Sequence, residues 1–461
     1  MATMPYIVLG PTCIVSLIGL IRGPDKTVPT PVEDWRRVTV DVVIPALNEE
    51  RNISMCLASV IRQTLRPRNI IVVDDGSMDR TAEIAKSFCE VNDINVIYIK
   101  RKGPIGKTPT IKRQAREFNA DVEFILDGDT ILESANYIER TVQELYQGVG
   151  IASACGVILP LREPDRKLML QVGSMQKFLA ACPDAPIELT GDLFARLKRG
   201  ATNIYRGALY MFLERFIYNG QMVLCGTITN PVGCAVAYRR KYIESLFEKY
   251  EPILGDDLTN SEDIFIGFAL INEGYRNIQV ADVFARSEEP EANRLPRQLY
   301  LWSSSFLQCC YYFDSLLKSP LKAVTRIWKH FRDPKPKEPA QEKRRILEAY
   351  RQPFGEEFTN AYGRPAGWVL FISAVEKVAF PTVLILMLIF KRWTAVGLTM
   401  LIESALTVSI LAAVSKGRRL EYAAKGILAT PVRYFSALWD FATIMRFVAD
   451  LWIFQDRSWR K

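Results

Sequence analysis

The stretch DVEFILDGDT, residues 121–130, places two aspartates, Asp127 and Asp129, on either side of Gly128 at the end of an apolar run. Two carboxylates this close repel each other and lose hydration unless a cation lies between them. Hard cations take oxygen ligands, often one or two carboxylates together with substrate phosphates. The pair therefore indicates a metal–diphosphate site, with Mg²⁺ or Mn²⁺ held by Asp129 and Asp127. A solvated turn is the simpler alternative, since Asp and Gly favour turns.

The elements that must position these aspartates alternate between strands and helices from residue 38 onward. Strand-like runs are VTVDVVIPA, NIIVVDD, INVIYIK and DVEFILDGD, and the segments between them have helical spacing. This alternation predicts parallel β/α units in one sheet. Ligands of such sheets bind at the carboxyl ends of the strands. Asp74 and Asp75 end the second strand, and Asp127 and Asp129 end the fourth, so these acidic residues fall where a ligand would bind.

Composition excludes several classes of function. The net charge of +8 comes from 59 basic and 51 acidic residues, an excess that is too diffuse to indicate nucleic-acid binding. The nine cysteines have no regular spacing, which favours reduced thiols in the cytosol. His330 is the single histidine, which disfavours a Ser-His-Asp hydrolase or a histidine-rich metal site. Any acid–base chemistry is expected to use carboxylates.

Apolar segments at both ends predict a multi-pass membrane protein. Residues 6–21 carry no charge, which predicts a transmembrane helix within 1–30, and the basic residues that follow place the next domain in the cytosol. Residues 366–390 and 393–414 are long enough to span, while 430–454 either spans or lies in the interface. The expected units are 1–30, the cytosolic domain 38–290, amphipathic interface helices with a charged loop at 291–365, and C-terminal membrane helices at 366–461.

Two segments near the membrane have particular chemistry. Residues 297–319 are aromatic and amphipathic, as suits a membrane interface. Ionisable residues inside spans usually face a protein interior or a water-filled path. The alternative is that they join one helix to another. The residues concerned are Glu376, Lys377, Glu403, Arg433, Asp440, Arg446 and Asp450.

Seven motifs, in order, resemble those of the membrane-embedded processive family 2 glycosyltransferases, the cellulose, chitin and hyaluronan synthases and their relatives. They are VVIPALNEE, IIVVDDGSMDRT, KGPIGKTPTIKR, DGDT, NPVGCAVAYRR, NSEDIFIGFALINEGYR and RQLYLW. The resemblance covers about residues 38–310 and the membrane layout. It implies a cytosolic GT-A domain, an α/β Rossmann-like mixed sheet, with interfacial helices and α-helical transmembrane segments, located in the plasma membrane.

For the donor, the resemblance implies a UDP-sugar. Asp74 and Asp75 are expected to contact the uracil ring, and Asn48 and Glu49 the ribose or base. Asp129, with Asp127, is expected to hold the metal against the diphosphate, so that charge on the leaving group is stabilised as it develops. Lys102 and Lys107 would add positive charge there, or lie in a solvated loop.

For the acceptor, the resemblance assigns the base to Asp263 in the Ser261-Glu262-Asp263 motif. An apolar helix starts at once, so the carboxylate lies at a helix N-terminus, where the dipole favours its ionised form. It can then take the proton of the acceptor hydroxyl. A simple N-cap by Ser261 is the alternative, and Asp256 with Asp257 is a competing acidic pair.

The motif around Gly233 and Cys234 is similar to the floor of the family's acceptor pocket. Gln298 and Trp302 keep the spacing of the family's QxxRW motif, and Trp302 is expected to stack on the acceptor sugar. The arginine of that motif, which contacts the donor diphosphate in the family, is replaced here by Leu301. Arg294, Arg297 or a lysine of residues 102–107 is a candidate substitute.

The leading functional prediction is an inverting, metal-dependent polysaccharide synthase. It would use a UDP-sugar to elongate a growing glycan and pass the product through its own membrane helices. The second is a non-processive transferase from a nucleotide sugar to a lipid acceptor, with the same donor site. A third class, a membrane channel or scaffold with an inactive domain, is disfavoured by intact Asp127, Asp129 and Asp263.

Overall fold

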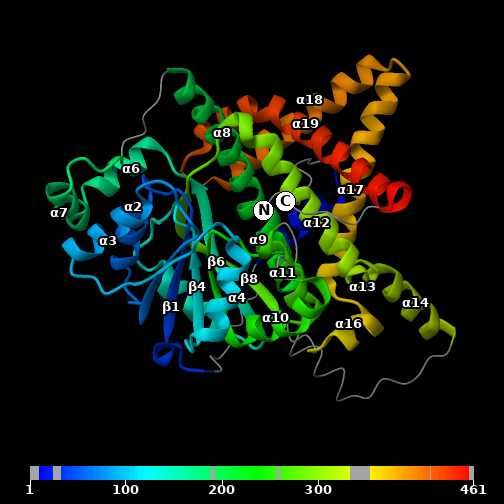
Figure 1. Ribbon diagram of the computed structural model, residues 1–461. Coiled ribbons are helices and arrows are strands. Elements are labelled where there is room, and N and C mark those ends of the chain that lie inside the picture. The colour runs from blue at the N-terminus through cyan, green and yellow to red at the C-terminus, as the bar shows by residue number, and fades with distance from the viewer. Residues whose placement is uncertain are drawn as a thin grey trace.

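The centre of the molecule is a mixed β-sheet covered by helices (Figure 1). The computed structural model describes residues 10–23, 33–187, 193–255, 258, 261–332, 354–415 and 417–455. Its eight described strands have the order β3-β2-β1-β4-β7-β6-β8-β5. Their bounds are β1 Val40–Ala46, β2 Asn69–Asp74, β3 Ile97–Lys100, β4 Val122–Leu126, β5 Thr130–Leu132, β6 Ile151–Pro160, β7 Ala235–Arg239 and β8 Arg276–Ser287.

The first four strands form the parallel half of the sheet, as the alternating sequence pattern predicts. β1 pairs in parallel with β2 and β4, and β2 pairs in parallel with β3. The other half is mixed: β7 is antiparallel to β4 and β6, β8 is parallel to β6, and β5 is antiparallel to β8. The expected α/β, GT-A-like mixed sheet with C-terminal helices is therefore confirmed.

Helices cover the sheet because its central strands are apolar on both faces. Every residue of β4 is buried, as expected for a parallel strand with helices on either side. The helices up to residue 272 are α2 Ile53–Ile61, α3 Thr81–Val91, α4 Lys107–Glu117, α5 Tyr137–Gln147, α6 Glu163–Leu170, α7 Gly173–Ala181, α8 Leu193–Phe212, α9 Tyr218–Cys225, α10 Arg240–Leu254 and α11 Glu262–Asn272.

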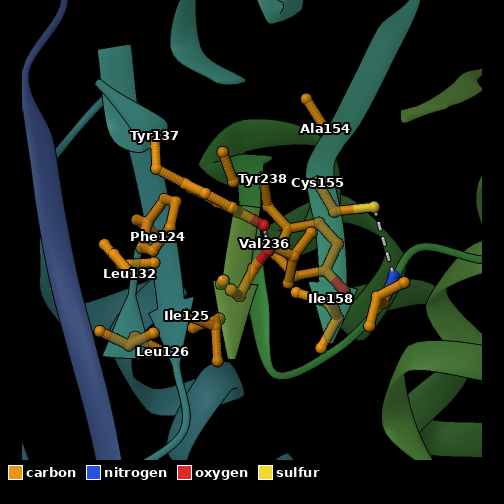
Figure 2. Packing of buried hydrophobic residues seen from close by; sticks show 14 of the residues in the cluster. Phe124, Ile125, Leu126, Leu132, Tyr137, Ala154, Cys155, Ile158, Val236 and Tyr238 are labelled. Carbon is orange, nitrogen blue, oxygen red and sulfur yellow. Dashed lines mark hydrogen bonds between the residues drawn. The ribbon is translucent and has the colours of Figure 1, made fainter. Parts of the chain in front are cut away.

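A buried tyrosine, Tyr137, links strands of the hydrophobic core (Figure 2). The Tyr137 hydroxyl donates to the carbonyl of Ala235 at 2.9 Å and accepts from the Gly156 N–H at 2.7 Å. Its ring lies edge-on to Phe124, with 5.9 Å between centroids. A Cβ at Gly156 would lie 2.5 Å from the ring, so only glycine fits there. One side chain of α5 therefore joins β6 to the start of β7.

Long helices at the C-terminus lie together at one side of the sheet domain (Figure 1). They are α17 Pro365–Ile389, α18 Trp393–Val414 and α19 Arg419–Ala449, preceded by α12 Leu295–Tyr312, α13 Asp314–Leu317, α14 Ser319–Arg332 and α16 Glu356–Tyr362. Among the described helices, α17 and α18 are long and apolar enough to cross a membrane by length and composition. Both coincide with segments expected to span.

The ionisable residues of these helices join one helix to another. Lys377 of α17 lies 2.6 Å from Asp440 of α19, which also accepts a hydrogen bond from Ser303 of α12. Glu403 of α18 pairs with Arg433 of α19, and both side chains are almost fully buried. Of the two interpretations that the sequence allows, the contacts support the helix-joining one for these residues.

The first described helix, α1 (Pro11–Arg22), packs closely against α9. A Cβ on Gly19 would lie 2.6 Å from the carbonyl oxygen of Gly220, and a Cβ on Gly220 would lie 2.4 Å from Cα of Ser16. The backbones of the two helices are thus in direct contact. With 12 described residues, α1 is about 18 Å long, short of a bilayer's hydrocarbon core of about 30 Å. Residues 1–9 lie outside the described part, so a crossing within 1–30 stays a prediction.

The exposed amphipathic helix lies further along the chain than residues 297–319. α12 buries Ser303, Ser304 and Ser305 and packs between α11 and α19. It is α14 that exposes a row of large apolar side chains, namely Leu321, Val324, Ile327, Trp328 and Phe331. The interface property predicted for 291–365 is therefore best matched by α14. The charged loop predicted at 332–345 falls, from residue 333 on, outside the described residues.

We expect Tyr137→Phe to lower the free energy of unfolding, because it leaves the Ala235 carbonyl and the Gly156 N–H buried without this partner. Each group left unpaired costs about 1–3 kcal/mol. Thermal or urea denaturation of the purified protein measures the loss. Tyr362→Phe is the matched control, since Tyr362 is 46% exposed and the change should cost less than about 0.5 kcal/mol. Equal stabilities of the two variants would contradict the role of the tyrosine.

Candidate active site

The DGD turn follows β4 directly and is fixed from two sides by backbone hydrogen bonds. The Asp127 N–H donates to the Cys234 carbonyl at 2.9 Å, and the Gly128 N–H donates to the Pro45 carbonyl at 3.2 Å. A Cβ on Gly128 would lie 3.2 Å from Cβ of Ala46, so a larger residue would have to displace β1. The turn therefore presents its two carboxylates at the carboxyl ends of β1 and β4.

On one side of the turn, the Lys107 ammonium group lies close to two carboxylates. Its Nζ lies 2.6 Å from Asp127 Oδ1 and 3.1 Å from Glu262 Oε1, and it donates to the Gly233 carbonyl at 3.0 Å. Burial alone would lower the pKa of Lys107, but Asp127 and Glu262 raise it well above its ordinary value. The ammonium group thus stays charged and joins α4, the DGD turn and the start of α11.

On the other side of the turn, the carboxylates of Asp129 and Glu49 lie among other negative charges with less positive charge to compensate them. Burial raises the pKa of Asp129 well above its usual range, and the nearby Glu49 and Asp127 add to this effect. Burial likewise raises the pKa of Glu49 to about 7, where a hydrogen bond from Asn52 opposes the shift and Glu288 adds to it. Protons or a cation are therefore needed to hold these oxygens together.

A divalent cation fits this set of donors. The side chains of Asp129 and Glu49 offer carboxylate oxygens, which are hard ligands, and their raised pKa values report unrelieved repulsion between negative charges. In the part of the chain that the structure describes, no group of three or more His, Cys, Asp or Glu side chains is already arranged around one ion. The protein would thus supply one or two ligands, and the phosphates of a substrate would supply others.

Asp263 lies at the start of α11, beside the Lys107 cluster. Its Oδ1 accepts from the Ser261 hydroxyl at 2.5 Å and from the Ile264 N–H at 2.8 Å, and its Oδ2 accepts from the Gly233 N–H at 3.2 Å. Three donors therefore fix the orientation of the carboxylate. The structure brings Asp263 and Glu262 next to Asp127, although these residues are distant in sequence. The role of Asp263 as a base stays a prediction, and Asp256 and Asp257 lie outside the described residues.

The two aspartates at the end of β2 are occupied within the protein. Asp75 accepts from Arg101 at 2.8 Å and from backbone N–H groups of the following loop. Asp74 accepts from the Ser77 N–H and the Tyr98 hydroxyl, each at 2.8 Å. These bonds shape the loop walls at the carboxyl end of β2. Contact with a nucleotide base stays a prediction for both, and Arg101 is a residue that the sequence analysis missed.

The other predicted donor residues lie at the same edge of the sheet, with one exception. Asn48 is exposed, has a φ of 58°, and accepts from the Met78 N–H at 3.0 Å. Glu49 belongs to the carboxylate cluster beside Asp129. Lys102, by contrast, is exposed and lies outside the Lys107 cluster. Of the two lysines, only Lys107 is therefore placed to act on a diphosphate near the DGD turn.

A buried arginine from α8 connects the two predicted acceptor residues. Arg206 donates to the Gln298 side chain, lies 4.3 Å from the centroid of the Trp302 ring, and is 3.5 Å from Glu289. Arg294 and Arg297, the candidates in α12 and just before it, are exposed. The cation beside the Gln298–Trp302 pair thus comes from another helix. In the sequence, Arg206 could be noticed only as a charged residue within an apolar part of a helix.

Comparison with known proteins agrees with this geometry. Residues 41–247 match the profile described as Glycosyl transferase family 2. The match covers less than half of the chain, and over these residues the chain is similar to family 2 glycosyltransferases. It includes the DGD turn, Lys107 and Gly233, while Glu262 and Asp263 lie just beyond the match.

Relatives of the family 2 domain match over short segments. The chain is 34% identical over 106 residues to 4,4'-diaponeurosporenoate glycosyltransferase of Staphylococcus haemolyticus, covering 23% of this chain and 28% of that protein. It is 30% identical over 115 residues to undecaprenyl-phosphate 4-deoxy-4-formamido-L-arabinose transferase of Photorhabdus laumondii, covering 24% and 35%. The matched segments span about a third or less of the length of such curated relatives.

Among solved structures, the chain is similar to the mannosyltransferase PcManGT from Pyrobaculum calidifontis, in complex with GDP-Man and Mn2+. The identity is 16%, the TM-score is 0.48, and the match covers 96% of this chain and 94% of that chain.

We expect Gly233→Ala to slow glycosyl transfer by at least about tenfold, because displacement of catalytic groups by about 1 Å can cost 10²-fold. The added Cβ would lie 2.8 Å from Cβ of Asp263, so it must push α11 away from the Lys107 cluster. Gly173→Ala is the control, since its Cβ meets nothing within 4 Å. Initial rates measured with both variants decide the matter, and a wild-type rate for Gly233→Ala would show that the close contact is not needed.

Proposed function

We propose that the protein is a metal-dependent, inverting glycosyltransferase that moves one sugar from a nucleotide-sugar donor to a membrane lipid. The observation that carries the proposal is the arrangement around the DGD turn. On one side lies the Lys107–Asp127–Glu262 cluster with Asp263 beside it, and on the other side lie the Asp129 and Glu49 carboxylates. A diphosphate and an acceptor can thus be handled on opposite sides of one turn.

Two observations favour a lipid acceptor over a growing polysaccharide. Trp302, expected to let a glycan slide past, has its ring against the Arg206 guanidinium, 4.3 Å away. Lys377 with Asp440, and Glu403 with Arg433, form pairs between the C-terminal helices, which supports packing and gives no support to a polar passage. The names of two relatives also include a polyprenyl phosphate and a carotenoid acid, both of which are lipids.

The residues have the following proposed roles. Asp129, with Asp127 beside it, would hold a divalent cation, which when bound supplies charge neutralisation at the diphosphate of the donor. Lys107 adds a fixed positive charge on the Asp127 side. Asp263, held by three donors, would take the proton of the attacking acceptor oxygen, either an alcohol hydroxyl or the P–OH group of a lipid phosphate. Inversion follows, because one base assists a single direct displacement and no covalent intermediate is formed.

Product analysis tests the acceptor. Purified protein in nanodiscs is incubated with a panel of UDP- and GDP-sugars, with and without undecaprenyl phosphate and a bacterial lipid extract, and nucleotide release is followed. We expect release that depends on lipid and a product that carries one sugar, identified by mass spectrometry. A ladder of many sugars formed without added lipid would contradict the proposal and favour a polysaccharide synthase.

Metal removal tests the donor site. We expect EDTA to abolish transfer and Mn²⁺ or Mg²⁺ to restore it, because the diphosphate would otherwise meet the Asp129 carboxylate. Asp129→Asn should remove the effect of metal on nucleotide binding, measured by calorimetry. Asp93→Asn is the matched control, since Asp93 is exposed, has a φ of 54°, and Asn tolerates this conformation. Full activity in EDTA would show that no divalent metal takes part.

A further inference from the structure

Helix α14 presents two faces of different chemistry. Large apolar side chains that are 56–80% exposed recur at helical spacing and so share one face. They are Leu321, Val324, Ile327, Trp328 and Phe331. Basic residues three or four positions apart share another face, and the helix contains no acidic residue. These are Lys322, Arg326, Lys329 and Arg332. An exposed apolar row rimmed by charge indicates an interaction surface.

The start of α14 is packed against the start of α17. The Arg364 N–H, just before α17, donates to the Ser319 hydroxyl at 2.9 Å. A Cβ on Gly363 would lie 2.7 Å from Cα of Ser319, so the two backbones are in direct contact. Lys322 fastens the next turn, because its Nζ donates to the Thr359 carbonyl on α16 at 2.9 Å. Beyond this turn α14 stands at the outer edge of the molecule (Figure 1).

This attachment gives the exposed face a level relative to α17. α17 is long and apolar enough to cross a membrane. Its first two turns carry Trp368 and Phe371, which are 42% and 37% exposed. Exposed aromatic side chains at the end of a span are typical of the boundary between lipid and water. A helix attached at this end of α17 lies at the same boundary.

We propose that α14 lies along the surface of a bilayer that contains anionic lipid. Its apolar row would enter the boundary between headgroups and acyl chains, as in other amphipathic surface helices. Arg326, Lys329 and Arg332 would extend from the other face to the lipid phosphates, because long basic side chains reach from an apolar surface to charged groups.

The charge of α14 favours this partner over a second copy of the chain. Anionic headgroups complement a helix that carries basic residues and no acidic ones, whereas two copies of α14 side by side would bring like charges together. The inference goes beyond the proposed function, since it holds for any donor and any acceptor.

Fluorescence quenching of the full-length protein in nanodiscs tests the depth of the apolar row. The contribution of Trp328 is the difference between the wild type and Trp328→Phe, a mild change at a side chain that is 65% exposed. We expect brominated phosphatidylcholine to lower this contribution at least about twofold, because the indole would touch acyl chains. Trp35→Phe is the control, since Trp35 precedes β1 in the sheet domain, and its contribution should not change.

The two other outcomes contradict the proposal. Quenching of Trp328 by aqueous iodide and not by brominated lipid would place the face in water. Protection from both quenchers, with two chains per nanodisc by native mass spectrometry, would assign the face to a second copy.

Hydrogen exchange tests the anionic lipid. We expect backbone amides of α14 to exchange at least about fivefold more slowly in nanodiscs with phosphatidylglycerol than with phosphatidylcholine alone, since each basic residue near an anionic surface contributes about this factor. Lys329→Gln should reduce the difference. Lys241→Gln is the matched control, because Lys241 is an exposed lysine of α10 and should leave the difference unchanged. Equal exchange in both nanodiscs, or equal effects of the two variants, overturns the proposal.

Discussion

The burial of several carboxylates at one edge of the sheet is the constraint on which the rest of the site depends. Negative charges this close cannot be buried without compensation. Gly128 separates them into two groups at a point where an added Cβ would lie only 3.2 Å from Cβ of Ala46 in β1. Lys107 neutralises one group. It also contacts Asp127, Glu262 and Gly233, which belong to three segments that are far apart in the sequence. In the other group, burial and the repulsion between neighbouring carboxylates raise the pKa values of Asp129 and Glu49.

Much of the sheet and the centre of the site could be predicted from the sequence, because both depend on local patterns. The alternating apolar runs fix the strands, and Asp127 and Asp129 follow a strand directly. Arg206 and Arg166 could not be predicted in this way. Each lies on a helix without a motif, and its partners become neighbours only when that helix packs against the end of β8 or the start of α12.

The C-terminal helices likewise have features that could be predicted from the sequence and features that could not. Length and hydropathy are properties of a segment alone, so the apolar character of α17 and α18 was predictable. The pairing of Lys377 with Asp440 depends on which faces of α17 and α19 meet, which no single segment determines. α12 has the aromatic and amphipathic sequence noted for residues 297–319 and buries Ser303, Ser304 and Ser305, while the exposed apolar row lies on α14, and an interfacial role for either helix stays a prediction.

Two serines in the middle of α12 contact different parts of the molecule. Ser305 donates to the carbonyl of Ser261, beside Asp263, and Ser303 donates to Asp440 on α19. α12 therefore connects the start of α11 to the C-terminal helices. If α17 and α18 cross a bilayer, this connection sets the height of the carboxylates of α11 and the DGD turn above it. Acceptors would then be sorted by reach, according to how far their reactive group projects from the lipid surface.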